Sequence, residues 1–201
     1  MKRLLVLIVV LFMVLGLANI VRADLVFNLD FGQDSNYENY WELKPGDTVL
    51  IDIYVSNVPD PGLISMGFDI VYDQTQLEVV SADIDQTNWY LGPGVQYTSP
   101  EIEMKGGRLK PGLSGDNIKL GMIELKCKAL GISELWLYDS DRGYGFGHYD
   151  DFVLAGGTVL DDQIVNGVKL AEVNNVPVPS TLLLLGSGLI GFLGLGRMIA
   201  S

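Results

Sequence analysis

The clearest candidates for chemistry lie in one acidic, glycine-rich stretch, residues 139–151. Its carboxylates are hard oxygen ligands of the kind that calcium prefers, and its glycines would let backbone carbonyls turn toward an ion. The spacing is not that of an EF-hand loop, and calcium needs six or more converging oxygens. The sequence therefore favours a solvated acidic loop, with a calcium site as the alternative. The candidate ligands are Asp139, Asp141, Asp150 and Asp151.

Nucleophilic or general-base catalysis has little support in the sequence. The single histidine, His148, lies in the acidic stretch, but no Gly-x-Ser-x-Gly or metalloprotease motif accompanies it. The single cysteine, Cys127, lies on the apolar face of an expected strand, where a thiol is usually packed and unreactive. One cysteine also excludes an internal disulfide. We predict a protein that is not an enzyme and has no cofactor.

Aromatic side chains offer a third kind of chemistry, because exposed rings can stack on the rings of sugars. Single aromatic residues are more often part of a core or a hairpin, and a platform requires several of them on one face. Trp136, between Leu135 and Leu137, is expected in the core. The aromatic residues in loop-like contexts are Trp41, Trp89, Tyr90, Tyr97, Tyr144 and Tyr149.

The charge of the chain limits its partners. Residues 24–175 hold all 25 acidic residues but only nine basic ones, which gives this span a formal charge of −16. Nucleic acids and anionic lipids are bound through clusters of Lys and Arg, so both are excluded as partners of this span. This charge favours neutral glycans or divalent cations as partners, or serves only solubility.

The hydrophobic pattern between the two ends of the chain has the period of strands. In residues 48–56, Val49, Ile51, Ile53 and Val55 alternate with more polar positions, as in a half-buried strand. In residues 118–129 the alternation changes phase beside Gly121, which is typical of a β-bulge. Short strands separated by Gly, Pro, Asn and Asp predict an antiparallel sandwich. Further strands are expected at 25–31, 64–72, 77–80, 134–138, 152–154 and 164–170, with a loop at 57–62.

Several of these segments resemble the cohesin family, which shares a jelly-roll-like β-sandwich with related carbohydrate-binding modules. The resemblance implies the fold and, by analogy, a module that binds a dockerin-like protein or a polysaccharide. It is strongest over about 35 residues and weak in residues 83–115. The matching segments are 44–49 (KPGDTV), 55–59 (VSNVP), 68–73 (FDIVYD) and 77–81 (LEVVS), with a looser match at 120–129.

The N-terminus has the features of a secretory signal peptide. Lys2 and Arg3 are followed by an apolar run over residues 4–17, and the residues up to Ala23 fit the small-x-small cleavage rule. We expect cleavage between Ala23 and Asp24, so that residues 1–23 are removed and the protein is exported.

The C-terminus ends in an apolar segment with no charge between residues 182 and 195. That length is short for a bilayer, but residues 179–200 approach the roughly 20 apolar residues of a spanning helix, with Arg197 at the interface. Its glycines are more typical of membrane helices than of soluble ones. We therefore expect a transmembrane tail.

The order of parts around this tail resembles the bacterial PEP-CTERM sorting signal, in which a Pro-x-Pro motif precedes a Gly-rich apolar helix and a basic end. The resemblance implies recognition by an exosortase, a membrane transpeptidase that cuts near the motif. Val178 replaces the usual Glu, and a single Arg replaces the usual basic cluster. A permanent membrane anchor is the alternative. The matching residues are Val176, Pro177, Val178, Pro179, Ser180, Thr181 and Arg197.

The sequence as a whole predicts three parts: a signal peptide (1–23), a cohesin-like β-sandwich (24–175) and a sorting signal with a transmembrane helix (176–201). The expected function is that of an exported, non-catalytic envelope or extracellular-matrix protein, sorted by an exosortase and binding a protein or polysaccharide. The alternative is a secreted accessory or enzyme of polysaccharide processing.

Overall fold

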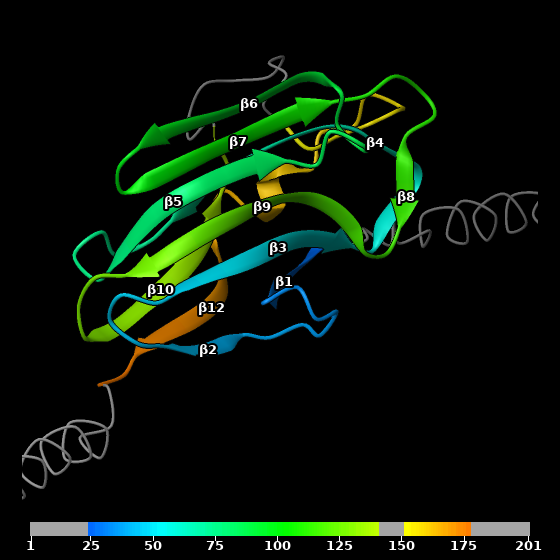
Figure 1. The fold of residues 1–201 in the computed structure, drawn as a ribbon. Helices are drawn as coiled ribbons and strands as arrows, with labels where there is room; N and C mark the ends of the chain where they lie inside the picture. Colours follow the sequence, from blue (N-terminus) through cyan, green and yellow to red (C-terminus); the bar gives the residue numbers. More distant parts are fainter. Residues whose placement is uncertain (1–23, 141–150, 178–201) are drawn as a thin grey trace, which may run out of the picture.

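The computed structural model describes residues 24–140 and 151–177, which are built almost entirely from β-strands (Figure 1). The strands, with one 3-10 helix (η1), are β1 Val26–Phe31, β2 Tyr40–Leu43, β3 Thr48–Ser56, β4 Val58–Val71, β5 Leu77–Ile84, β6 Leu91–Thr98, β7 Glu101–Gly107, β8 Leu113–Gly115, β9 Ile118–Cys127, β10 Gly131–Tyr138, β11 Val153–Leu154, η1 Asp161–Gln163 and β12 Val168–Asn175.

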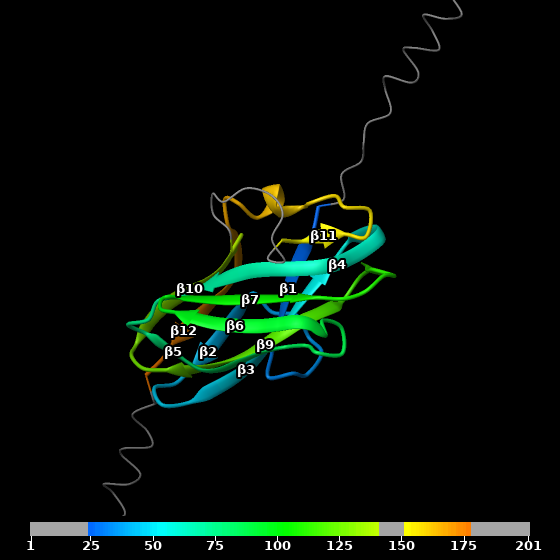
Figure 2. The ribbon, with the colours of Figure 1, turned by 90° about the horizontal axis from the view of Figure 1, so that it is seen from above.

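The strands form two sheets that pack face to face as a sandwich (Figure 2). The four-stranded sheet has the order β1-β3-β9-β5. The eight-stranded sheet has the order β2-β12-β10-β4-β7-β6, with β8 and β11 also paired to β4. All pairs are antiparallel except β2–β12, which is parallel. The chain is therefore an all-β sandwich, as the alternating pattern predicts.

The core lies between the two sheets. It consists of the side chains that point inward at every second position of each strand. On β3, Ile51, Ile53 and Val55 are fully buried, and on β4, Met66 and Phe68 are too. Each such side chain stabilises the fold by roughly 1.5–3 kcal/mol when it leaves water. The expected inward faces of both strands are confirmed.

The bulge expected beside Gly121 is also confirmed. Ile53 of β3 lies opposite Gly121 of β9, but Tyr54 lies opposite Lys119, so one residue of β9 is left without a partner. A Cβ at Gly121 would overlap the carbonyl oxygen of Asp83 on β5. Glycine is thus needed here because β5 and β9 approach closely at the bulge.

The prediction of a loop at 57–62 is wrong except at Asn57, since residues 58–62 are the first part of β4. Val58 and Leu63 pair with β8, but the register shifts between them, where Pro59 and Pro61 lie. Proline has no N–H for a ladder hydrogen bond and is tolerated in a strand where the pairing is irregular.

Other boundaries differ from the sequence expectation as well. The strand expected at 164–170 begins at Val168, because η1 and a turn through Gly167 occupy the preceding residues. Strands β2, β6, β7 and β8 were not anticipated. In β6 the sequence Leu-Gly-Pro-Gly has few side chains to define a period, although the buried Ile102 and Met104 of β7 do alternate.

The described chain enters and leaves at opposite ends of the sandwich (Figure 1). Near the start, the Leu25 N–H donates to the side chain of Gln163 at 2.6 Å. At the other end, the Val176 N–H donates to the Leu43 carbonyl at 2.9 Å, which continues the β2–β12 pairing past the last strand residue.

Candidate partner-binding face

The outer face of the four-stranded sheet is open, since no strand or helix of residues 24–140 and 151–177 lies across it (Figures 1 and 2). Alternation sends the aliphatic half of each strand inward and leaves a mixed polar and apolar set outside. We call this surface the partner-binding face. It consists of Asn28 and Asp30 on β1, Leu50, Asp52 and Tyr54 on β3, Lys119, Met122 and Glu124 on β9, and Val80 and Asp83 on β5.

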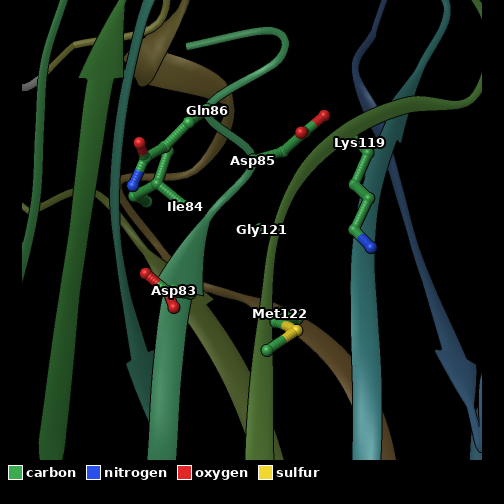
Figure 3. A pocket seen from close by; sticks show the side chains of 7 residues that line it. All are labelled: Asp83, Ile84, Asp85, Gln86, Lys119, Gly121 and Met122. Carbon is green, nitrogen blue, oxygen red and sulfur yellow. The ribbon is translucent and has the colours of Figure 1, made fainter. Parts of the chain in front are cut away.

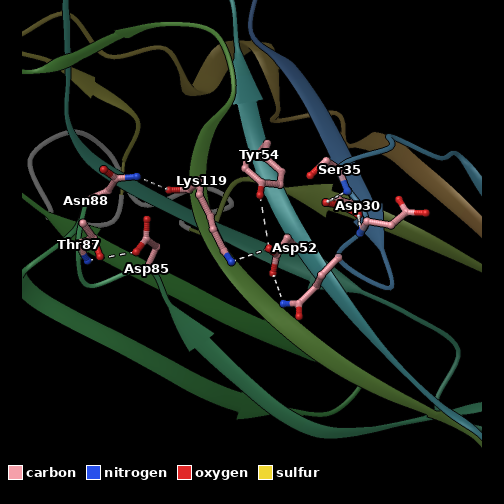
Figure 4. Close-up of polar contacts among 10 residues, drawn as sticks. Asp30, Ser35, Asp52, Tyr54, Asp85, Thr87, Asn88 and Lys119 are labelled. Carbon is pink, nitrogen blue, oxygen red and sulfur yellow. Dashed lines mark hydrogen bonds and ion pairs between the residues drawn. The ribbon is translucent and has the colours of Figure 1, made fainter.

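Asp52 is the centre of a hydrogen-bond network on this face (Figure 4). It is only 5% exposed, yet its carboxylate accepts bonds from Lys119 Nζ at 2.6 Å and from Gln33 Nε2 at 2.8 Å. The Tyr54 hydroxyl donates to the same group at 3.4 Å. Burial raises the pKa of Tyr54 to about 12, and the negative charge of Asp52 adds to the rise. Tyr54 therefore stays a neutral donor at physiological pH.

The turn after β1 supports one side of this network. The Asp30 carboxylate accepts the backbone N–H groups of Asp34 and Ser35, both at 3.0 Å, and so closes the turn from which Gln33 reaches Asp52. Tyr37 from the same turn packs against Tyr54, with ring centroids 5.5 Å apart. The face is thus ordered by side chains from three separate segments.

A shallow depression of about 330 Å³ lies at the end of β5, beside the bulge of β9 (Figure 3). The turn after β5 is fixed by Asp85, which accepts the Thr87 N–H at 3.1 Å, and by Asn88 and Trp89, which donate to the Lys119 carbonyl at 3.2 and 2.9 Å. The depression offers two carboxylates beside a thioether, which suits a basic or hydrogen-bonding side chain of a partner. Its lining residues are Asp83, Ile84, Asp85, Gln86, Lys119, Gly121 and Met122.

Comparison with known proteins agrees with this architecture. The family model described as cohesin domain matches residues 41–117, and the one described as PEP-CTERM protein-sorting motif matches residues 175–197. No curated protein matches the chain.

Solved cohesin structures share the fold. A cohesin module from a family 33 glycoside hydrolase of Clostridium perfringens has a TM-score of 0.52 at 12% identity, over 76% of this chain and 98% of that one. The third cohesin ScaC of Acetivibrio cellulolyticus, in complex with the ScaB dockerin, has a TM-score of 0.51 at 14% identity, over 75% and 99%. CaCohA2 of Clostridium acetobutylicum has a TM-score of 0.50 at 15% identity, over 75% and 91%.

Of the acidic residues proposed from the sequence, Asp139 follows β10 and Asp151 precedes β11. Both of these strands pair with β4 in the eight-stranded sheet, so the two residues lie away from the partner-binding face. The structure brings Asp139 and Asp151 together with Asp161 of η1, and one carboxylate oxygen of each lies within 4.8 Å of the others. Asp141 and Asp150, together with His148, lie outside the described residues. Asp161 was not singled out from the sequence, because it is ten residues beyond Asp151 and no spacing rule joins the two.

Asp139, Asp151 and Asp161 form an acidic cluster, and burial changes the protonation of Asp161 within it. Burial raises the pKa of Asp161 to about 8, the Phe152 N–H at 2.8 Å opposes the rise, and the charges of Asp151 and Asp139 add to it. A carboxyl group with such a pKa holds a proton at neutral pH. Calcium binding at Asp139 and Asp151 stays a prediction.

Two of the other residues singled out from the sequence, Cys127 and Trp89, belong to the core, and Trp41 packs against it. Cys127 is buried, and burial raises the pKa of its thiol, as expected for a packed cysteine. Trp89 is fully buried, and Trp41 stacks on Phe31 with centroids 5.3 Å apart, so neither serves an exposed platform. Trp136 was expected in the core, but it lies on the outer face of the eight-stranded sheet, because Leu135 and Leu137 point inward.

Only parts of the two terminal signals belong to the described residues. Asp24 is the first of these residues, and Val176 and Pro177 are the last, at the start of the PEP-CTERM motif. Within residues 24–140 and 151–177 no helix has the length and apolarity needed to cross a bilayer. The remaining signal residues lie outside the description: Ala23, Val178, Pro179, Ser180, Thr181 and Arg197.

Proposed function

We propose that this protein is an exported, non-catalytic surface or matrix protein that binds another protein through its partner-binding face. The observation that carries this proposal is the open four-stranded sheet, which presents apolar side chains around an ordered polar centre. Val80 on the edge strand β5 is 50% exposed, and Met122 on β9 and Leu50 on β3 are partly exposed. Protein interfaces commonly combine apolar contacts with direct hydrogen bonds between polar groups.

The partner is a dockerin-like protein. The ScaC cohesin with the same fold is solved with a dockerin, which supports a protein ligand for this domain. The depression beside Asp83 and Asp85 adds two carboxylates, so the partner should present Lys or Arg there. Charge complementarity of this kind fixes the register of a complex and speeds its formation.

Export and sorting complete the proposal. Residues 1–23 act as a signal peptide cut between Ala23 and Asp24, and the match at 175–197 supports processing by an exosortase-type transpeptidase. The tail holds the protein in the membrane until it is cut near Pro177, after which the domain reaches the cell surface or matrix. Mass spectrometry of surface-exposed protein tests this step, because a recovered C-terminal peptide through Arg197 would rule out the cut.

The binding step is tested with a tagged full-length chain produced in its own host. After surface cross-linking, we expect wild type to retain a dockerin-containing protein. Val80→Arg and Met122→Arg should lose it, because each places a long charged side chain on this face. Leu109→Arg is the matched control, since Leu109 is 63% exposed but lies in the loop after β7, off this face. Undiminished capture by both face variants would overturn the assignment of the face.

A further inference from the structure

The outer face of the eight-stranded sheet carries a second organised group of side chains, on the far side of the sandwich from the partner-binding face. We call this group the aromatic face. It lies on β2, β12 and β10 and consists of Tyr40, Glu134, Trp136, Tyr138, Lys169, Glu172 and Asn174.

Strand register places these residues side by side. Tyr40 of β2 lies opposite Glu172 of β12, and Glu172 lies opposite Glu134 of β10. One step further along, Trp136 lies opposite Lys169. Residues two apart on a strand share a face, so Glu134, Trp136 and Tyr138 follow one another on the outside. Cross-strand neighbours are about 5 Å apart, which makes the group one continuous surface.

The aromatic rings of this surface are held in position. The rings of Trp136 and Tyr138 are nearly parallel, at 26°, with centroids 6.2 Å apart. The Tyr138 ring lies against Gly167, where any side chain would overlap it. Tyr40 is 44% exposed, and its hydroxyl donates to Glu42 at 3.1 Å and accepts from Asn174 Nδ2 at 3.0 Å.

The charged groups between the rings are paired with one another. Lys169 Nζ lies 2.5 Å from Glu134 and 3.4 Å from Glu172. Glu134 also accepts the indole N–H of Trp136 at 3.0 Å. The hydrogen bond with Lys169 lowers the pKa of Glu134 and raises that of Lys169, so both stay charged. The surface thus offers many fixed donors and acceptors with little net charge.

A depression of about 360 Å³ lies at the edge of this group, beside Tyr40. Its polar lining comes from Asn39, Lys169 and Glu172, and its apolar lining from Leu170 and Ala171. Aromatic rings next to carboxylate and amide groups match a ligand with apolar C–H faces and hydroxyl edges.

We propose that the aromatic face binds a neutral, β-linked polysaccharide. The pyranose rings of such a chain present flat C–H faces to Tyr40, Trp136 and Tyr138, and their hydroxyl groups meet Glu134, Lys169 and Glu172. The strongly acidic composition of the domain disfavours polyanionic glycans. Because the two faces lie on opposite sides of the sandwich, the protein can hold a protein partner and a glycan at once. This inference does not depend on the protein-binding role proposed above.

The test uses the full-length chain in a detergent without a sugar headgroup. Its migration in native gels is measured with and without soluble mixed-linkage β-glucan, and with polygalacturonate as the polyanion. We expect retardation by the glucan alone. Trp136→Ala and Tyr40→Ala should each weaken binding about tenfold or more, as truncation of a central aromatic residue does. Tyr97→Ala is the matched control, since Tyr97 is 55% exposed on β6 at the far edge of the same sheet.

Fluorescence gives an independent readout of the same interaction. Of the three tryptophans, Trp89 is fully buried and Trp41 is stacked on Phe31, so a glucan-dependent change should come from Trp136 and vanish in Trp136→Phe. Val80→Arg should bind glucan like wild type, which separates this face from the partner-binding face. Absence of retardation in wild type, or equal retardation of Trp136→Ala, would overturn the proposal.

Discussion

Lys119 and Asp52 form an ion pair across neighbouring strands of the open sheet, with 2.6 Å between Nζ and the carboxylate. The side chain of Asp52 is 7% exposed and that of Lys119 is 30% exposed, so the pair lies at the border between core and solvent. Sixty-seven positions separate the two residues in the chain. The pair holds together the centre of the partner-binding face, and several predictions concern this and similar contacts.

Removing the cation should destabilise the domain, because the buried Asp52 carboxylate would lose its charged partner. We expect Lys119→Met to lower the free energy of unfolding by roughly 1–3 kcal/mol. The matched control is Lys105→Met, whose partner Glu103 is 2.8 Å away in a more exposed pair, and which should change stability by less than about 1 kcal/mol. Urea unfolding measures both. The double variant Asp52→Asn/Lys119→Met should recover part of the loss, and equal losses in the two single variants would contradict this account.

Stability should fall as pH rises, on account of Asp161. The folded-state pKa is about 8 and the ordinary value is 3.8, so between these values the native protein holds a proton that the unfolded chain has lost. The free energy of unfolding therefore decreases with pH across this window. Asp161→Asn keeps an acceptor for the Phe152 N–H but does not titrate, so its melting temperature should vary less between pH 5 and pH 9.

Bound calcium would make the protein more stable, not less, as pH rises, because a cation bound by Asp139, Asp151 and Asp161 favours the deprotonated carboxylates. Melting curves at pH 8 in excess calcium and in chelator distinguish the two cases. A proton-holding cluster gives identical curves, whereas a calcium site gives a higher melting temperature with calcium.

A side chain at the bulge of β9 should disturb the open sheet. Gly121→Ala places a Cβ against the Asp83 carbonyl and the Met104 side chain, so we expect a loss of about 1–3 kcal/mol in thermal unfolding. Gly156→Ala is the control, because the nearest heavy atom to its added Cβ is 3.7 Å away on Pro61. A loss at Gly156 as large as that at Gly121 would show that the close approach of β5 to β9 is not the cause.

The two prolines of the sorting motif should be needed for processing. Replacing Pro177 and Pro179 by Ala keeps the apolar segment but removes the restricted, extended backbone that proline imposes. We expect the double variant to accumulate in the membrane fraction as a longer precursor, visible by immunoblot and mass spectrometry. If the protein instead has a permanent anchor, wild type and variant will have the same mass and location.

Much of the fold could be predicted where the pattern is local. The alternation in residues 48–56 and 118–127 predicts both strands, and its change of phase beside Gly121 predicts the bulge. Such a pattern depends only on the types of neighbouring residues. The edge hairpin of β6 and β7 was missed, since glycine and proline interrupt its pattern. The start of β4 was expected to be a loop for a similar reason: prolines normally end a strand, and only the irregular pairing with β8 accommodates them.

The candidate sites could be predicted only in part. Asp139 and Asp151 were identified from composition, but Asp161 joins them through the packing of η1, which no spacing rule encodes. The sequence predicts a loop-like context for Trp89 and a core position for Trp136. Trp89 fills the core, whereas Trp136 lies outside, because the neighbouring leucines take the inward positions of β10.

The sequence by itself determined the features that are linear: the alternating strands, the acidic balance, and the order of a sorting motif after a sandwich domain. These follow from residue type and short spacing, which the chain carries without being folded. Only the tertiary structure decided which sheet face stays open, which carboxylates meet, and that Tyr40 and Trp136 share a surface. The reason is physical, because pairing of strands distant in sequence sets both register and layer, and a shift of one residue would send each side chain to the opposite face.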